Sequence, residues 1–145
     1  MKRILTSGAA VALLCLAVPA AAADLKLLTS WNTDNWPTYA ALDMFEKKVK
    51  SIGEGKVTIS ISGKEVVPPF EQLQPVSAGV FDMLYTHGIY HAGSKGIAFT
   101  MDAVAPGPKK RRDAGLIDYI DNYYQKHNNM KLLGLVANSN QGYHI

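Results

Sequence analysis

The sequence is nearly free of cysteine, since its 145 residues include only one, Cys15. We expect Cys15 to be removed with an export signal, so the mature chain has no thiol for a disulfide framework or a nucleophilic site. Hydrophobic residues make up 48% of the chain and charged residues 19%, a balance that is typical of a globular protein and excludes a disordered one. The mature protein therefore forms one domain that is stable through its core alone.

An excess of charge of one sign is also missing. The formal net charge is +3 at pH 7, and two of the positive residues, Lys2 and Arg3, lie in the segment that we expect to be removed. Nucleic-acid-binding domains usually carry a strongly basic face, so we expect no nucleic-acid partner. The basic run Lys109–Arg112 is predicted to be solvated, or to form a docking surface. It should precede the first turn of a helix, because cations are unfavourable at a helix N-terminus.

Motifs that mark catalysis and phosphate binding are absent as well. The chain has no G-x-S-x-G elbow, no G-x-x-x-x-G-K-[ST] phosphate loop and no G-x-G-x-x-G dinucleotide fingerprint. Its acidic residues are scattered, and no two of them can be placed face to face from the sequence. We therefore expect a protein that is not an enzyme and that uses no cofactor.

One pair of histidines leaves an enzymatic alternative open. His87 and His91 are four residues apart, a spacing that brings two imidazoles to one face of a helix for zinc. Gly88 weakens such a helix and stands where the glutamate of an H-E-x-x-H motif belongs. The main expectation is that no metal is bound, and the alternative is an exported metal-dependent enzyme that uses both histidines.

Residues 1–23 are typical of a secretory signal peptide. A positive start is followed by the unbroken apolar run Ala9–Ala17, and Ala21–Ala23 supplies the small residues that a signal peptidase requires. A membrane anchor is the alternative, but Pro19 interrupts the apolar stretch ahead of the small residues. We expect cleavage after Ala23 and export to the periplasm.

Strand and helix patterns alternate after the signal. Leu25–Trp31 is a short apolar run that predicts a strand. Pro37 suits the first turn of a helix that ends before Gly53. The apolar positions that recur at helical spacing, and that we expect to face the core, are Tyr39, Leu42, Phe45, Val49 and Ile52.

The pattern continues with Val57–Ser62, whose alternating apolar and polar residues predict a half-buried strand. A short helix is predicted from Pro69 or Phe70 through Val76, and a third strand over Phe81–Thr86.

The last part of the chain predicts a further helix and strand. The strand, Leu132–Ala137, is apolar throughout, as expected of a parallel strand covered on both faces. The apolar face of the helix comprises Ala114, Ile117, Ile120 and Tyr124. This alternation of elements predicts an α/β domain with a mostly parallel sheet.

Three blocks of this sequence resemble one protein family. They are Leu28–Asn32, Glu65–Glu71 and Val76–Met83, and in this order they resemble the TRAP-transporter periplasmic solute-binding proteins of the DctP type. The resemblance extends over nearly all of residues 24–138. Thr86–His91 departs from it, because the family commonly has a denser aromatic run at this place.

The resemblance implies the first lobe of a two-lobed periplasmic-binding-protein-like fold. It also implies capture of a small organic acid and its delivery to the membrane permease subunits of the transporter. Family members are considerably longer, and they hold the acid mainly through an arginine of the other lobe that no residue here matches. We therefore expect residues 24–145 to be a truncated N-terminal lobe. The alternatives are a fold that closes at Gln141–Ile145, which has the pattern of the start of another extended segment, or a non-functional fragment.

Ligands of open α/β sheets bind at the carboxyl ends of the strands. In this sequence, four candidate ligand-binding residues lie at or after the predicted strand ends. Trp31 and Asn32 lie at the end of the first strand; the alternative is that Trp31 is a core residue and Asn32 forms the turn beside it. Glu65 follows the second strand and could instead project from a solvated loop. Tyr90 follows the third strand, and Tyr85 offers a second hydroxyl unless it lies in the core.

The signal-peptide assignment predicts the mass of the mature protein. The intact mass of the exported protein should correspond to a chain that begins at Asp24, because the small residues at Ala21–Ala23 favour processing. Mass spectrometry of the periplasmic fraction measures this directly. Recovery of the full-length form embedded in membranes would contradict the assignment.

Overall fold

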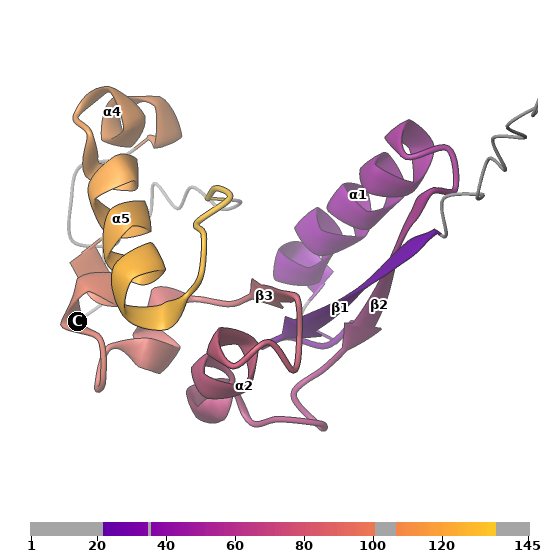
Figure 1. The fold of residues 1–145 in the computed structure, drawn as a ribbon, viewed down its shortest axis with the longest axis horizontal. Coiled ribbons are helices and arrows are strands. Elements are labelled where there is room, and N and C mark those ends of the chain that lie inside the picture. The colour runs from indigo at the N-terminus through magenta and orange to yellow at the C-terminus, as the bar shows by residue number, and fades with distance from the viewer. Residues whose placement is uncertain (1–21, 35, 101–106, 136–145) are drawn as a thin grey trace, which may run out of the picture.

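The computed structural model describes residues 22–34, 36–100 and 107–135. Strands and helices alternate in the first part of the described chain, and only helices follow in its last part (Figure 1). They are β1 (Ala23–Thr29), α1 (Trp36–Ile52), β2 (Val57–Ser62), α2 (Leu73–Ser77), β3 (Met83–Tyr85), α4 (Pro108–Asp113) and α5 (Leu116–Asn128). Single turns of 3-10 helix cover Pro69–Glu71, Gly88–His91 and Gly96–Phe99.

The three strands form one parallel sheet in the order β2-β1-β3. Ala23 pairs with Val57 at the start of the β1–β2 ladder, and Thr29 pairs with Tyr85 at the end of the β1–β3 ladder. The chain thus moves from the centre of the sheet to one edge and then to the other. Right-handed crossovers place two such connections on opposite faces, and Figure 1 shows α1 and α2 on opposite sides of the strands. The predicted α/β fold with a parallel sheet is confirmed.

The core lies around the central strand. Leu27 and Leu28 are adjacent in β1 and point to opposite faces, yet both are buried, with 2% and 0% of their surface exposed. A strand that is covered on both faces is typical of a parallel sheet. Among the described residues, the other buried apolar side chains are Leu42 of α1, Leu73 and Val76 of α2, and, further along the chain, Ala98, Ile117 and Ile120.

The predicted helix after β1 is confirmed, but its predicted buried face is only partly correct. Leu42 is buried, whereas Phe45 and Ile52 are 40% and 69% exposed. The three-stranded described sheet covers Leu42 but leaves these two apolar side chains of α1 exposed. Gly55, with a φ of 77°, turns the chain after the helix toward β2.

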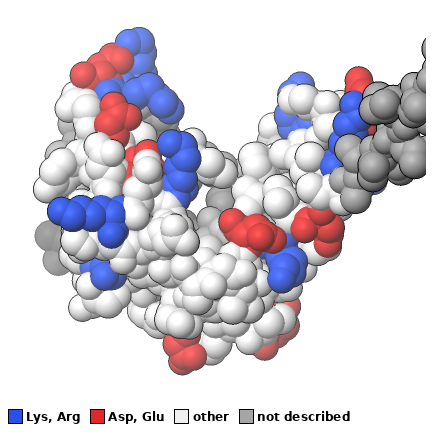
Figure 2. Space-filling view, viewed as in Figure 1, with Lys and Arg blue, Asp and Glu red and all other residues white. Residues whose placement is uncertain are grey.

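The prediction for Lys109–Arg112 was wrong in position. These residues do not precede a helix but form most of α4. Lys110, Arg111 and Arg112 lie in its last turn, where the helix dipole stabilises positive charge. Gly115, with a φ of 73°, separates α4 from α5, so that Ala114 of the predicted apolar face lies outside the helix, whereas Ile117, Ile120 and Tyr124 lie in α5. Figure 2 shows the basic side chains gathered at the tip of the molecule where α4 lies.

The strand predicted over Leu132–Ala137 is not formed in its described part, since residues 132–135 are irregular. The backbone N–H of Leu132 donates to Asp121 Oδ1 over 2.7 Å and is therefore not available to a sheet ladder. Residues 136 and 137 lie outside the described residues. The third predicted strand is present but shorter than Phe81–Thr86, because it pairs with β1 only over Met83–Tyr85.

Residues 1–21 of the predicted signal peptide also lie outside the described residues. Within the described ranges, no helix has the length and apolar character needed to cross a membrane.

Candidate functional site

The carboxyl ends of the three parallel strands lie along one side of the sheet, which we call the carboxyl edge. Trp31 and Asn32 follow β1, Gly63 and Glu65 follow β2, and Tyr90 lies in the turn of 3-10 helix after β3. Because the strands are parallel, all of these residues leave the sheet at the same edge. Figure 1 shows the chain running from β3 at this edge toward α5.

Four aromatic rings form an aromatic cluster at this edge. The Trp31 ring lies 5.1 Å from that of Tyr85 and 6.1 Å from that of Tyr90, and the Phe70 ring lies 5.2 Å from that of Tyr90. Each pair is arranged edge to face, as aromatic quadrupoles prefer. The structure thus brings the predicted residues Trp31 and Tyr90 together. It also adds Phe70, a residue that is 73% exposed and that was not among the candidates from the sequence.

Tyr85 resolves the two roles that the sequence left open. Its hydroxyl donates to the Thr38 carbonyl oxygen over 2.9 Å and so connects β3 to α1. Burial raises the pKa of the Tyr85 hydroxyl above its ordinary value. Tyr85 therefore packs against Trp31 as part of the cluster, and its hydroxyl is hydrogen-bonded to Thr38.

Asn32 and Glu65 converge on Gly63. The Gly63 N–H donates to Glu65 Oε1 over 2.9 Å, and a Cβ atom on Gly63 would lie 2.7 Å from Asn32 Oδ1. Asn32 Oδ1 is buried and has no hydrogen-bond partner among the described residues. A side chain at position 63 would displace the ends of Asn32 and Glu65, so these two acceptor groups lie close together. The Asn32 oxygen has no donor among the described residues.

The buried amide of Gln72 connects the loops of this edge, and sequence reasoning did not find it. Its side chain has 0% exposure; Nε2 donates to the carbonyl oxygens of Thr29 and Val67 over 3.0 and 2.9 Å. The Ser30 hydroxyl donates to Gln72 Oε1 over 2.6 Å and also lies 2.7 Å from Thr86 Oγ1. Gln72 thus joins the end of β1 to the loop after β2, and Ser30 extends the link to the residue after β3.

The two histidines have separate surroundings. His87 Nδ1 accepts from the Ile89 N–H over 3.2 Å and caps the following turn of 3-10 helix. His91 is 3% exposed, and its Nε2 has no partner among the described residues. Within the described ranges, no group of three or more His, Cys, Asp or Glu side chains is placed to hold a metal ion.

Comparisons with known proteins give matches among solved structures only. No family model matches the chain, and no curated protein matches it. A TRAP transporter solute-binding protein from Bordetella bronchiseptica RB50, with copurified calcium and picolinate in its active site, superimposes with a TM-score of 0.62 at 20% identity. A TRAP periplasmic solute-binding protein from Rhodobacter sphaeroides, in an apo open structure, gives a TM-score of 0.53 at 23% identity.

These matches cover 74% and 73% of this chain but only 34% and 35% of the two solved chains. The chain thus spans about a third of the length of the proteins that it resembles. At these identities the likeness shows the fold, which is that of one lobe of a periplasmic-binding-protein-like structure, as expected from the sequence. Both solved proteins are binding proteins rather than enzymes.

The Gln72 hydrogen bonds predict a large effect on stability. Gln72→Leu should lower the free energy of unfolding by about 2–4 kcal/mol, because the carbonyl oxygens of Thr29 and Val67 lose their donor and the Ser30 hydroxyl loses one of its two partners. Gln72→Glu should also destabilise the protein, since a carboxylate keeps the shape but cannot donate. The exposed Gln74→Leu, two residues away, is the matched control and should change stability by less than about 0.5 kcal/mol. Urea denaturation followed by circular dichroism measures all three, and a Gln72→Leu protein as stable as the wild type would refute the role of this amide.

Burial of His91 predicts a loss of stability in acid. Burial lowers the pKa of its imidazole below the ordinary value of 6.5, so the unfolded chain takes up a proton at a higher pH than the folded one. The stability that the protein gains from keeping His91 neutral is therefore fully present above pH 6.5. It declines as the pH falls from 6.5 to the pKa of His91 in the folded protein. In His91→Gln the decline should be smaller, while the exposed His127→Gln should retain it. Denaturation curves at a series of pH values test this, and equal pH dependence in all three proteins would contradict it.

Proposed function

We propose that residues 24–145 form the first lobe of a periplasmic solute-binding receptor of a TRAP-type secondary transporter, of the DctP type, and that residues 1–23 are its cleaved signal peptide. The observation that carries the proposal is the parallel sheet β2-β1-β3, with Trp31, Asn32, Glu65 and Tyr90 leaving it at one edge. The fold likeness to two TRAP solute-binding proteins supports it.

The ligand in this proposal is a small organic acid. The aromatic cluster offers an apolar wall, and the acceptors of Asn32 and Glu65 offer polar contacts to hydroxyl or amino groups of the ligand. These acceptors repel a carboxylate, so the acid group must face away from them, toward a cation of the second lobe. The picolinate held by the Bordetella bronchiseptica protein is itself a carboxylate, which supports this class of ligand.

The mechanism is capture without chemistry. One lobe supplies one wall of a cleft, and closure of a second lobe over the ligand excludes water and strengthens each polar contact. The closed receptor then delivers the acid unchanged to the membrane permease subunits of the transporter. In this mechanism Trp31 and Tyr90 position the ligand, and no residue takes part in bond making or breaking.

Calorimetry of the intact two-lobed receptor, of which this lobe is a part, against a panel of organic acids tests the proposal. At least one acid should bind saturably and be recovered unchanged. Trp31→Ala should weaken its affinity about tenfold or more, because the largest ring of the apolar wall is lost. Val66→Ala, an exposed apolar residue beside Glu65, is the control and should leave the affinity unchanged.

Three outcomes would overturn the proposal. They are consumption of any acid by the protein, no binding across the whole panel, and an affinity that is the same in Trp31→Ala as in the wild type.

A further inference from the structure

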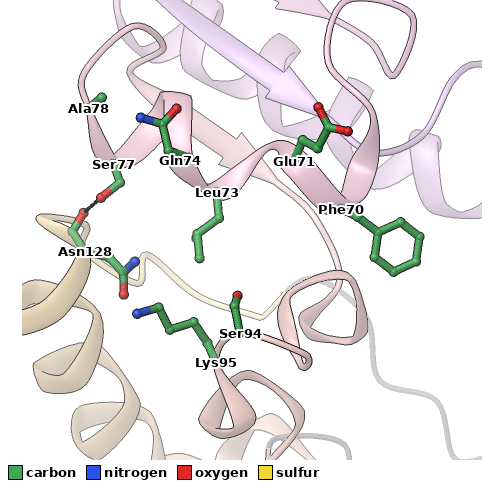
Figure 3. A pocket seen from close by; sticks show the side chains of 9 residues that line it. All are labelled: Phe70, Glu71, Leu73, Gln74, Ser77, Ala78, Ser94, Lys95 and Asn128. Carbon is green, nitrogen blue, oxygen red and sulfur yellow. Dashed lines mark hydrogen bonds between the residues drawn. The ribbon is translucent and has the colours of Figure 1, made fainter.

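A cavity lies apart from the strand ends that carry the candidate site. It has a volume of about 420 Å³ and is bounded by α2, by the turn at residues 94–95 and by the end of α5 (Figure 3). Of the aromatic cluster, only Phe70 borders it. None of the four candidate ligand-binding residues from the sequence lines this cavity, so it is separate from the proposed receptor site.

Asn128 presents an unsatisfied amide to this cavity. The residue is 7% exposed, and its Oδ1 is buried with no hydrogen-bond partner among the described residues. Its carbonyl oxygen accepts from the Ser77 hydroxyl over 2.5 Å, which fixes the end of α5 against α2. A buried amide oxygen without a donor is costly in a folded protein. The cavity side of Asn128 is therefore suited to a ligand that donates a hydrogen bond.

Lys95 brings a cation to the same part of the cavity. Figure 3 shows its side chain extending toward the amide of Asn128, with Leu73 directed into the space above them. The Lys95 N–H donates to the His91 carbonyl oxygen over 2.7 Å, so the backbone from which the side chain extends is held in place. The acidic lining residue, Glu71, carries its carboxylate away from Lys95 in this view.

We propose that this cavity binds a small monocarboxylic acid that carries a hydrogen-bond donor next to its carboxylate, as hydroxy acids and amino acids do. The carboxylate pairs with Lys95 Nζ, the hydroxyl or ammonium group donates to Asn128 Oδ1, and the apolar part of the acid lies against Leu73. The Glu71 carboxylate disfavours a second acidic group at its end of the cavity.

Nuclear magnetic resonance of the full chain, with ¹⁵N in the Asn side chains, tests this with three acids of equal carbon number. L-lactate and L-alanine carry the donor, and propionate lacks it. Lactate, alanine or both should shift the Asn128 side-chain amide saturably, and propionate should bind about tenfold more weakly because it leaves Asn128 unsatisfied. Binding of lactate alone assigns a hydroxy acid, and binding of alanine alone assigns an amino acid.

Substitutions separate this site from the proposed receptor site. Lys95→Met keeps the aliphatic stem and should weaken the binding about tenfold through loss of the charge-assisted contact. Trp31→Ala, which alters the aromatic cluster, should leave it unchanged, as should the control Lys110→Met on α4. An Asn128 amide that no acid shifts would overturn the proposal. So would equal affinity for propionate and lactate, or binding that survives in Lys95→Met or is lost in Trp31→Ala.

Discussion

The hydrogen bonds of the buried Gln72 amide hold together the edge of the sheet on which the proposed site depends. One uncharged side chain donates to the carbonyl oxygens of Thr29 and Val67 and accepts from Ser30, which in turn contacts Thr86. These groups belong to the segments that follow all three strands. Because the bonds to Thr29 and Ser30 are buried, replacing the amide leaves the Thr29 carbonyl oxygen without this donor in a place that water does not reach. Geometry at this edge is therefore set by polar contacts as much as by the packing of Leu27 and Leu28 below it.

The positions of the candidate residues follow from that constraint. Trp31 continues directly from the segment that Gln72 holds, and its ring is supported by Tyr85, whose hydroxyl is bonded to α1. Asn32 and Glu65 approach each other closely because Gly63 leaves room between them. The result is a rigid apolar wall beside two acceptors. Such a wall suits one side of a closing cleft, since it is organised before the ligand arrives and loses little freedom on binding.

Much of this fold was predictable because its signals are local. Apolar alternation in Val57–Ser62 and the helical spacing that ends at Gly53 depend on neighbouring residues only, and both elements are present. The edge that carries Trp31 and Tyr90 followed from the rule for parallel sheets. Gln72 could not be found in this way, because its burial depends on distant partners, and a polar glutamine beside Glu71 is typical of an exposed residue. The apolar run at Leu132 was misassigned for a related reason: a distant carboxylate, Asp121, binds its backbone.

A crystal structure of the protein bound to an acid from the calorimetric panel tests the central claim most directly. The account predicts the ligand at the carboxyl edge of the sheet, with its apolar part against the Trp31 ring and a donor group within hydrogen-bond distance of Asn32 Oδ1 or the Glu65 carboxylate. A ligand bound away from this edge, with no contact to Trp31, Asn32 or Glu65, would contradict it.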